Sequence, residues 1–164
     1  MLSWRDFLIW IEGSALGNLI RDSGVWTYGV INLIHIIGIA TLFGSILILD
    51  LRLLGWRRTI GLDSIATLSL PLAVSGFCIA FFSGICMLAT NGSDYAGNPF
   101  LLIKFTAIAL GLVNALVVSR LSAWKAMRSR DLLPRELTQL AVLGGLSLLC
   151  WVTALSAGRM IGYW

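Results

Sequence analysis

The chain has 164 residues, of which 58% are apolar and 12% are charged, and its mean hydropathy is +0.89. These values exclude an ordinary soluble domain and predict an integral membrane protein, small enough to form one all-α unit in the lipid bilayer. The net charge of +4 does not indicate nucleic-acid binding, because the basic residues adjoin apolar segments and form no polar, aromatic-rich surface.

Residues 1–22 form the first segment, in which apolar side chains recur at helical spacing. Asp6 and Glu12 lie inside it and no basic stretch precedes it, which argues against a signal peptide. We therefore expect an amphipathic helix that lies along the membrane interface. A helix that caps the bundle is an equally good interpretation.

Residues 23–164 contain four apolar segments, each long enough to cross a hydrocarbon core of about 30 Å as a helix. They are 25–49, 64–89, 99–119 and 137–157. Lipid offers the backbone no hydrogen-bond partners, so membrane-crossing segments of this kind must be helices. The sequence thus predicts a four-helix transmembrane bundle.

Basic residues near the helix ends predict the orientation of this bundle. One side receives Arg52, Arg57, Arg58, Arg120, Lys125, Arg128, Arg130 and Arg135, and the other receives Arg5, Arg21 and Arg159. The positive-inside rule makes the first side cytoplasmic, with both termini outside a bacterial inner membrane. Asp50 and Asp63 lie at the basic boundary, where we expect interfacial ion pairs with the neighbouring arginines.

Small residues recur at intervals of four in two of the predicted spans. They are Gly76, Ala80 and Gly84 in the second span, and Ala107, Gly111 and Ala115 in the third. Such stripes allow helix backbones to approach closely in lipid. They predict tight packing, either within one chain or in a homo-oligomer or larger membrane complex.

Few polar side chains lie inside the predicted spans, and ionisable groups there are candidates for function. They are His35, the only histidine, with Asn32, Lys104 and Asn114, and with Arg159 at the end of the last span. At about 1.5 Å per residue, His35 lies ~15 Å below Val25, close to the midplane, and Lys104 lies ~8 Å below Pro99.

This distribution matches the needs of haem b. His35 would be the axial ligand of the iron, and Lys104 and Arg159 would face the propionates. Asn32 and Asn114 would line the same pocket. A single copy of the chain has no second histidine, so the other axial position falls to Lys104, to Met87 or another side chain, to a second protomer, or stays open.

Other interpretations of these residues are open. His35 could hydrogen-bond a neighbouring helix, with Asn114 as its partner, while Lys104 extends to the headgroups. Copper is a rival metal, because Cys86 and Met87 follow Cys78 at helical spacing, although such residues more often fill a core. A small transporter is disfavoured, since the chain has no inverted repeat and no series of protonatable groups.

The run HIIGIATLFGSILILDLR, which begins at His35, resembles the first helix of HemJ-type protoporphyrinogen oxidases, with Thr41, Phe43 and Arg52 near the corresponding places. NPFLLIKFTAIALGLVNALVV resembles a later helix of that family, with Lys104 in the place of its lysine. The resemblance implies haem b and a functional role for the histidine and lysine. Leu42 replaces the expected tryptophan and the family's other histidines are missing, so protoporphyrinogen oxidation does not carry over.

The whole chain, with LDLRLLG, NPF-x3-K and GRMIGYW, resembles a bacterial inner-membrane family of unknown function that is similar to HemJ and to CopD-like copper-resistance domains. We therefore expect a haem-b-binding membrane redox protein or an oxidoreductase component. The alternatives are a non-catalytic assembly or anchoring subunit of a membrane complex, or a small transporter or copper-handling protein.

Overall fold

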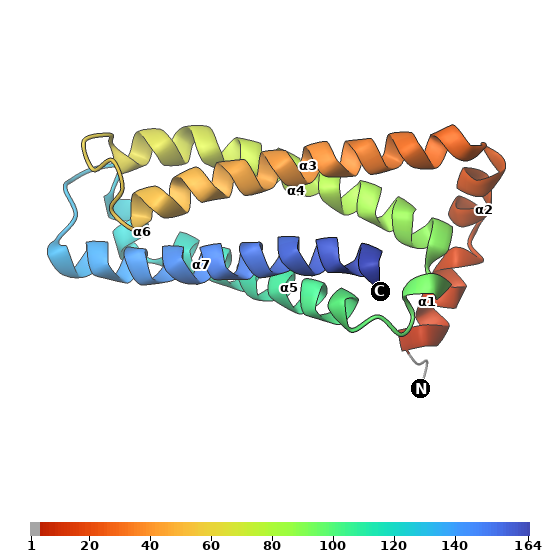
Figure 1. Ribbon diagram of the computed structural model, residues 1–164. Helices are drawn as coiled ribbons and strands as arrows, with labels where there is room; N and C mark the ends of the chain where they lie inside the picture. Colours follow the sequence, from red (N-terminus) through yellow and green to blue (C-terminus); the bar gives the residue numbers. More distant parts are fainter. Residues whose placement is uncertain (1–3) are drawn as a thin grey trace. The chain divides into compact units, whose positions relative to one another are not determined.

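The computed structural model describes residues 4–164, and it is 84% helical, with no strand among those residues. Four helices are long and apolar enough to cross a membrane (Figure 1): α3 Val25–Leu53, α4 Leu62–Asn91, α5 Pro99–Arg120 and α7 Pro134–Met160. The shorter ones are α1 Trp4–Glu12, α2 Ala15–Asp22, η1 Ser93–Tyr95, α6 Ser122–Ala126 and η2 Ile161–Tyr163. The predicted all-α class with four candidate spans is confirmed.

The helix ends extend slightly beyond the predicted spans. α7 begins at Pro134, where proline suits the first turn of a helix. Glu136 stabilises this start, because its carboxylate accepts a hydrogen bond from the backbone N–H of Leu133 at 2.9 Å. α3 runs to Leu53 and so includes Asp50, which the predicted end at residue 49 left outside.

The chain divides into two compact units, which we describe separately. The first unit consists of Met1–Leu42 and Val74–Pro99. Within it α3 and α4 touch through glycines: a Cβ atom added to Gly76 would lie 2.5 Å from the Leu42 nitrogen and 2.8 Å from the Gly38 carbonyl oxygen. Part of the small-residue stripe of α4 therefore serves packing within the chain.

The expected N-terminal helix is two helices, α1 and α2, with residues 1–3 of that segment outside the described part of the chain (Figure 1). The chain turns at Gly13, and the Ser14 side chain caps α2 by accepting a hydrogen bond from the Gly17 N–H at 3.3 Å. Leu8 is completely buried, whereas Trp10 is 68% exposed. The pair thus keeps one packed face and one apolar outer face.

α1 and α2 bind the C-terminal end of α4. Arg21 donates hydrogen bonds to the carbonyl oxygens of Ala89 and Thr90 at 3.2 and 3.0 Å. The last carbonyls of a helix lack partners within it and carry partial negative charge, so a guanidinium is a favourable cap. The Ser93 N–H donates to a Glu12 carboxylate oxygen at 2.6 Å. These contacts attach α1 and α2 to the end of α4 and to η1.

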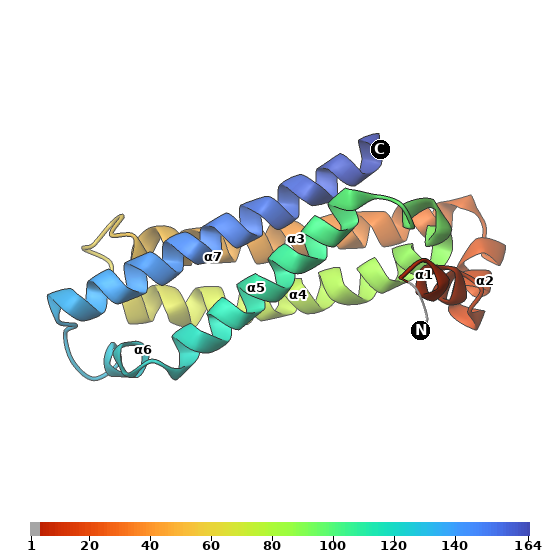
Figure 2. The ribbon, with the colours of Figure 1, turned by 90° about the horizontal axis from the view of Figure 1, so that it is seen from below.

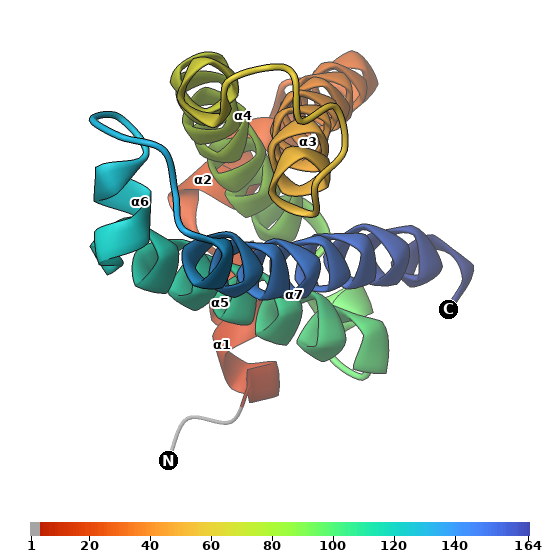
Figure 3. The same cartoon turned by 90° about the vertical axis from the view of Figure 1, so that its left-hand side faces the viewer.

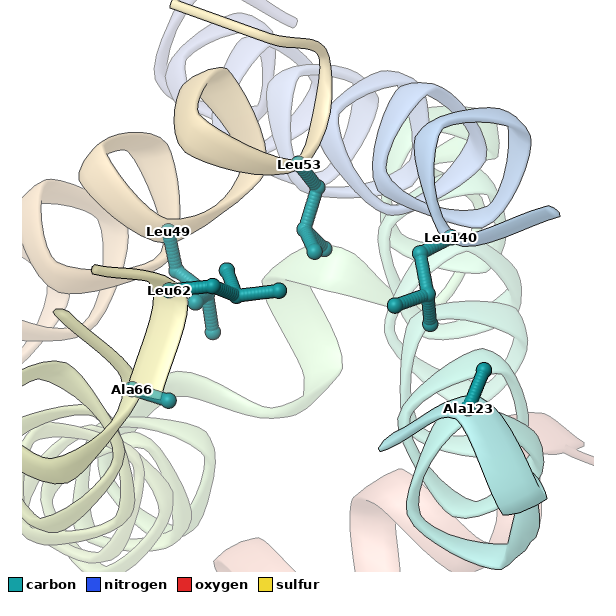
Figure 4. Close-up of a cluster of buried hydrophobic side chains, with 6 residues drawn as sticks. All are labelled: Leu49, Leu53, Leu62, Ala66, Ala123 and Leu140. Atoms are coloured by element: carbon teal, nitrogen blue, oxygen red, sulfur yellow. The ribbon is translucent and has the colours of Figure 1, made fainter. Parts of the chain in front are cut away.

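The second unit consists of Phe43–Ala73 and Phe100–Trp164. Its core cluster is Leu49, Leu53, Leu62, Ala66, Ala123 and Leu140 (Figure 4). α5 and α7 lie side by side (Figure 2), and a Cβ atom on Gly111 would be 3.2 Å from the Trp151 ring. α6, beside the first turns of α7 in Figure 3, lies in the basic stretch between the third and fourth predicted spans. It forms because Ala123 enters the core at 1% exposure.

Candidate functional site

His35 lies on α3, half-buried, with its ring directed at α4 in the first unit. Its Nδ1 atom is 2.9 Å from the hydroxyl oxygen of Ser83, which is buried. The Ser83 hydroxyl donates its own hydrogen to the Ile79 carbonyl oxygen at 2.6 Å. A hydroxyl has one hydrogen, so while that hydrogen is donated to Ile79 the contact with His35 has the imidazole Nδ1–H as donor. In this tautomer Nδ1 carries the proton and Nε2 carries the lone pair.

Gly84 provides the space for this imidazole. A Cβ atom at Gly84 would lie 3.2 Å from His35 Cε1 and 3.7 Å from Nδ1. The Ser83-Gly84 pair of α4 therefore both fixes the protonation of the ring and leaves room for it. Gly84, one member of the small-residue stripe, therefore faces the His35 side chain, whereas Gly76 faces the backbone of α3.

Two further candidates share the first unit with His35. Asn32 precedes it by about one helical turn on α3, and Met87 follows Ser83 by about one turn on α4; both are half-buried. Of the rival copper ligands, Cys78 is exposed and Cys86 is half-buried. Within residues 4–164 there is no group of three or more His, Cys, Asp or Glu residues that could hold a metal ion.

Lys104 and Arg159 both belong to the second unit, near the start of α5 and the end of α7. Lys104 on α5 packs against α7, where its Cε and Nζ atoms would be 3.6 Å from a Cβ atom on Gly158. The next residue, Arg159, donates to the Tyr163 hydroxyl, and its guanidinium lies 4.7 Å from the centre of that ring. The half-buried ammonium and the exposed guanidinium thus concentrate positive charge where α5 begins and α7 ends.

Asn114 lies apart from these two cations. It follows Lys104 by ten residues on α5, which corresponds to about 15 Å along the helix axis. It is 5% exposed, and its Nδ2 group donates to the Leu143 carbonyl oxygen at 3.0 Å. Asn114 is therefore bonded to α7 in the second unit, whereas His35 has Ser83 as a partner in the first.

The sequence did not indicate the role of Ser83, and it indicated a different environment for Asp50. Ser83 precedes Gly84 of the α4 stripe, but Ser75 precedes Gly76 in the same way, so this pattern did not single out Ser83. Asp50 was expected in an interfacial ion pair, but it is 3% exposed and accepts a hydrogen bond from the Ser147 side chain. The longer α3 explains this difference, because it carries Asp50 into the packed part of the second unit. Asp63 does form an ion pair, with Arg128 at 3.3 Å.

Comparison with known proteins identifies the family. A family model described as a family of unknown function, DUF6644, matches residues 7–164, which is nearly the whole chain. No curated protein and no solved structure matches. The resemblance to HemJ-type and CopD-like proteins accordingly stays a prediction. The chain, which has four candidate membrane spans, belongs to DUF6644, a family of unknown function.

Proposed function

We propose that this protein binds haem b through His35 and acts as a membrane redox protein or as the electron-transfer part of an oxidoreductase. The hydrogen bond between His35 Nδ1 and Ser83 carries the proposal. Metal-binding histidines generally donate the N–H of one ring nitrogen to a nearby acceptor, which orients the ring and leaves the other nitrogen as the ligand. The tautomer that Ser83 imposes has Nε2 as that ligand atom.

The residues of the chain fit the chemistry of this group. A haem supplies reversible one-electron chemistry, with a potential tuned by its axial ligands and by the polarity around it. His35 provides the axial nitrogen, and Met87 of the same unit is a candidate for the second axial position. Lys104 and Arg159, in the second unit, carry positive charge of the kind that propionates require. Asn32, which precedes His35 by about one helical turn in the first unit, adds a polar group on the same helix.

We place the protein in a bacterial inner membrane, with both termini outside. Eight lysine and arginine residues flank one set of helix ends and three flank the other, and the richer side is cytoplasmic by the positive-inside rule. His35 then lies near the midplane, and the cations of Lys104 and Arg159 lie in the outer half of the bilayer. The proposal is compatible with a chain that acts as a monomer, as a homo-oligomer, or as part of a larger membrane complex.

A second candidate function is that of a non-catalytic assembly or anchoring subunit. The same His35 to Ser83 hydrogen bond favours it, because polar contacts between helices stabilise membrane bundles, on average by about 0.6 kcal/mol each. In that case the contact joins α3 to α4 and the imidazole has no metal. Substitution of His35 should abolish haem binding under the first function and should lower only the stability of the bundle under the second.

Haem titration of the detergent-purified protein separates them. For the first function, the wild type binds haem saturably with a Soret band, and His35→Ala loses that binding while Asn18→Ala, which alters an exposed amide of α2, retains it. For the second, neither protein binds haem saturably, and His35→Ala lowers only the unfolding temperature. That second result would refute the haem proposal.

A further inference from the structure

Asp50 is an isolated carboxylate inside the second unit. It is 3% exposed, and one of its oxygens accepts a hydrogen bond from the Ser147 side chain of α7. The other, Oδ2, is buried and has no hydrogen-bond donor among residues 4–164. An unpartnered oxygen in a protein interior is costly, and the cost is greater when the oxygen is charged.

Asn114 presents a second buried oxygen of this kind. Its Nδ2 group donates to the Leu143 carbonyl, which can only accept, so the orientation of the amide is fixed. Oδ1 of Asn114 is consequently an acceptor, and it too is buried without a donor in the described chain. The third oxygen of this group in residues 4–164, Oδ1 of Asp63, faces the Arg128 guanidinium.

The side chains of Asp50 and Asn114 both bond to α7, at positions one helical turn apart, Ser147 and Leu143. In an α-helix the Leu143 carbonyl points toward residue 147, so the partners of Asn114 and Asp50 are successive points on one helix. Between them, at Gly144, α3 lies against α7: a Cβ atom there would be 2.8 Å from Leu53 Cβ and 3.4 Å from the Asp50 carbonyl oxygen. Side chains of α3 and α5 are thus bonded to positions one helical turn apart on α7.

Within residues 4–164, no ion pair is found for the Asp50 carboxylate. Arg52, two residues away, directs its guanidinium to the carbonyl oxygens of Ile60 and Arg58 at 2.8 and 3.4 Å. A buried water could donate to both free oxygens, but it would not neutralise the charge, and an unneutralised carboxylate in an apolar interior is very costly.

We propose that Asp50, Asn114 and Ser147 form a binding site for a small monovalent cation of the Na⁺ or K⁺ type. Carboxylate, amide and hydroxyl oxygens are the ligands that hard cations prefer, and a cation contacts three or more oxygens at once, whereas a proton bridges two. One carboxylate with two neutral ligands balances a single positive charge. A divalent ion would leave excess charge in the interior. The site is independent of the haem proposal.

The test is cation-dependent stability of the full-length protein in detergent. We expect the unfolding temperature to rise saturably with NaCl or KCl relative to choline chloride at equal ionic strength, by on the order of 5 °C at 100-fold saturation. The comparison of the two salts identifies the preferred ion. Asp50→Asn and Asn114→Leu should abolish the rise, and Asp63→Asn, which alters an aspartate of the same unit that is paired with Arg128, should preserve it.

Equilibrium binding of ²²Na⁺ and ⁸⁶Rb⁺ to the wild type completes the test without depending on any variant folding. Saturable binding of either ion with about one site per chain supports the site. Identical stability in sodium, potassium and choline salts, together with no saturable binding of either radioisotope, would overturn it. Such a result, with Asp50→Asn more stable than the wild type in every salt, would instead assign a proton to Asp50.

Discussion

The Nδ1 atom of His35 on α3 lies 2.9 Å from the hydroxyl oxygen of Ser83 on α4, and this hydroxyl donates a hydrogen bond to the Ile79 carbonyl. In this series the imidazole Nδ1–H donates to the Ser83 hydroxyl, and the hydroxyl donates to the Ile79 carbonyl. Removal of the middle group should change the chemistry of the imidazole without removing it. This makes Ser83 the most informative position near His35.

Ser83→Ala should weaken haem binding about 10–100-fold, because the acceptor that orients and polarises the ligand ring is lost. The dissociation constant is measured by titration with haem, followed at the Soret band. Ser45→Ala is the control, since it removes another buried serine, 8% exposed, that belongs to the second unit. Equal affinities of Ser83→Ala and the wild type would contradict the role given to this hydrogen bond.

Gly76→Ala should destabilise the protein by about 1–3 kcal/mol, because the added methyl group meets the backbone of α3 at Leu42 and Gly38. Gly29→Ala is the matched control on α3, where a Cβ atom has nothing within 4 Å. There, the better helix propensity of alanine should stabilise by up to about 1 kcal/mol. Reversible unfolding in mixed micelles measures both, and equal effects would show that Gly76 is not a close-packing position.

Arg21→Met should destabilise the first unit by about 1–2 kcal/mol, because the Ala89 and Thr90 carbonyls at the end of α4 lose a charged donor. The loss should appear as faster hydrogen exchange at the last turn of α4 and in α2. Arg5→Met, at an exposed arginine of α1, should leave exchange there unchanged. Unaltered exchange in Arg21→Met would mean that the cap contributes nothing.

The Glu12 carboxylate should make this N-terminal attachment sensitive to acid. Hydrogen bonds from Ser93 hold the pKa of Glu12 below its usual value of 4.5. The group therefore contributes stability that is fully present above pH 4.5 and is lost as the pH falls through the lowered pKa. Glu12→Gln should lose less stability than the wild type when the pH is lowered from about 6 to about 3. Parallel pH profiles of the two proteins would contradict this.

The sequence alone predicted the helices well and their contacts poorly. Continuous apolar runs bounded by Gly55 and by the loop before Pro99 determine four spans, because lipid permits few other structures. The break in the N-terminal segment depends on a local cap at Ser14, and the pattern of apolar residues there continues through it. Helical periodicity therefore gave one helix where the structure has two.

For the candidate site, too, the sequence indicated individual residues but not their partners. Scarcity of polar groups in apolar helices was enough to select His35, Lys104 and Arg159. Their partners were not predictable, since a hydrogen bond such as that of His35 to Ser83 joins residues 48 positions apart. The prediction for Asp50 was wrong because the predicted span ended one residue before it, whereas α3 continues to Leu53 and carries Asp50 into the interior. Charge pattern alone carries no information about such a small difference in depth.

The most direct test of the haem proposal is the visible absorption spectrum of the purified protein, oxidised and dithionite-reduced, beside that of His35→Ala. The account predicts a Soret band with reduced α and β bands in the wild type, all absent from the variant. A wild type that is colourless after expression with haem supply and after haem addition would contradict it. Bands that persist unchanged in His35→Ala would also contradict the assignment of His35 as the ligand.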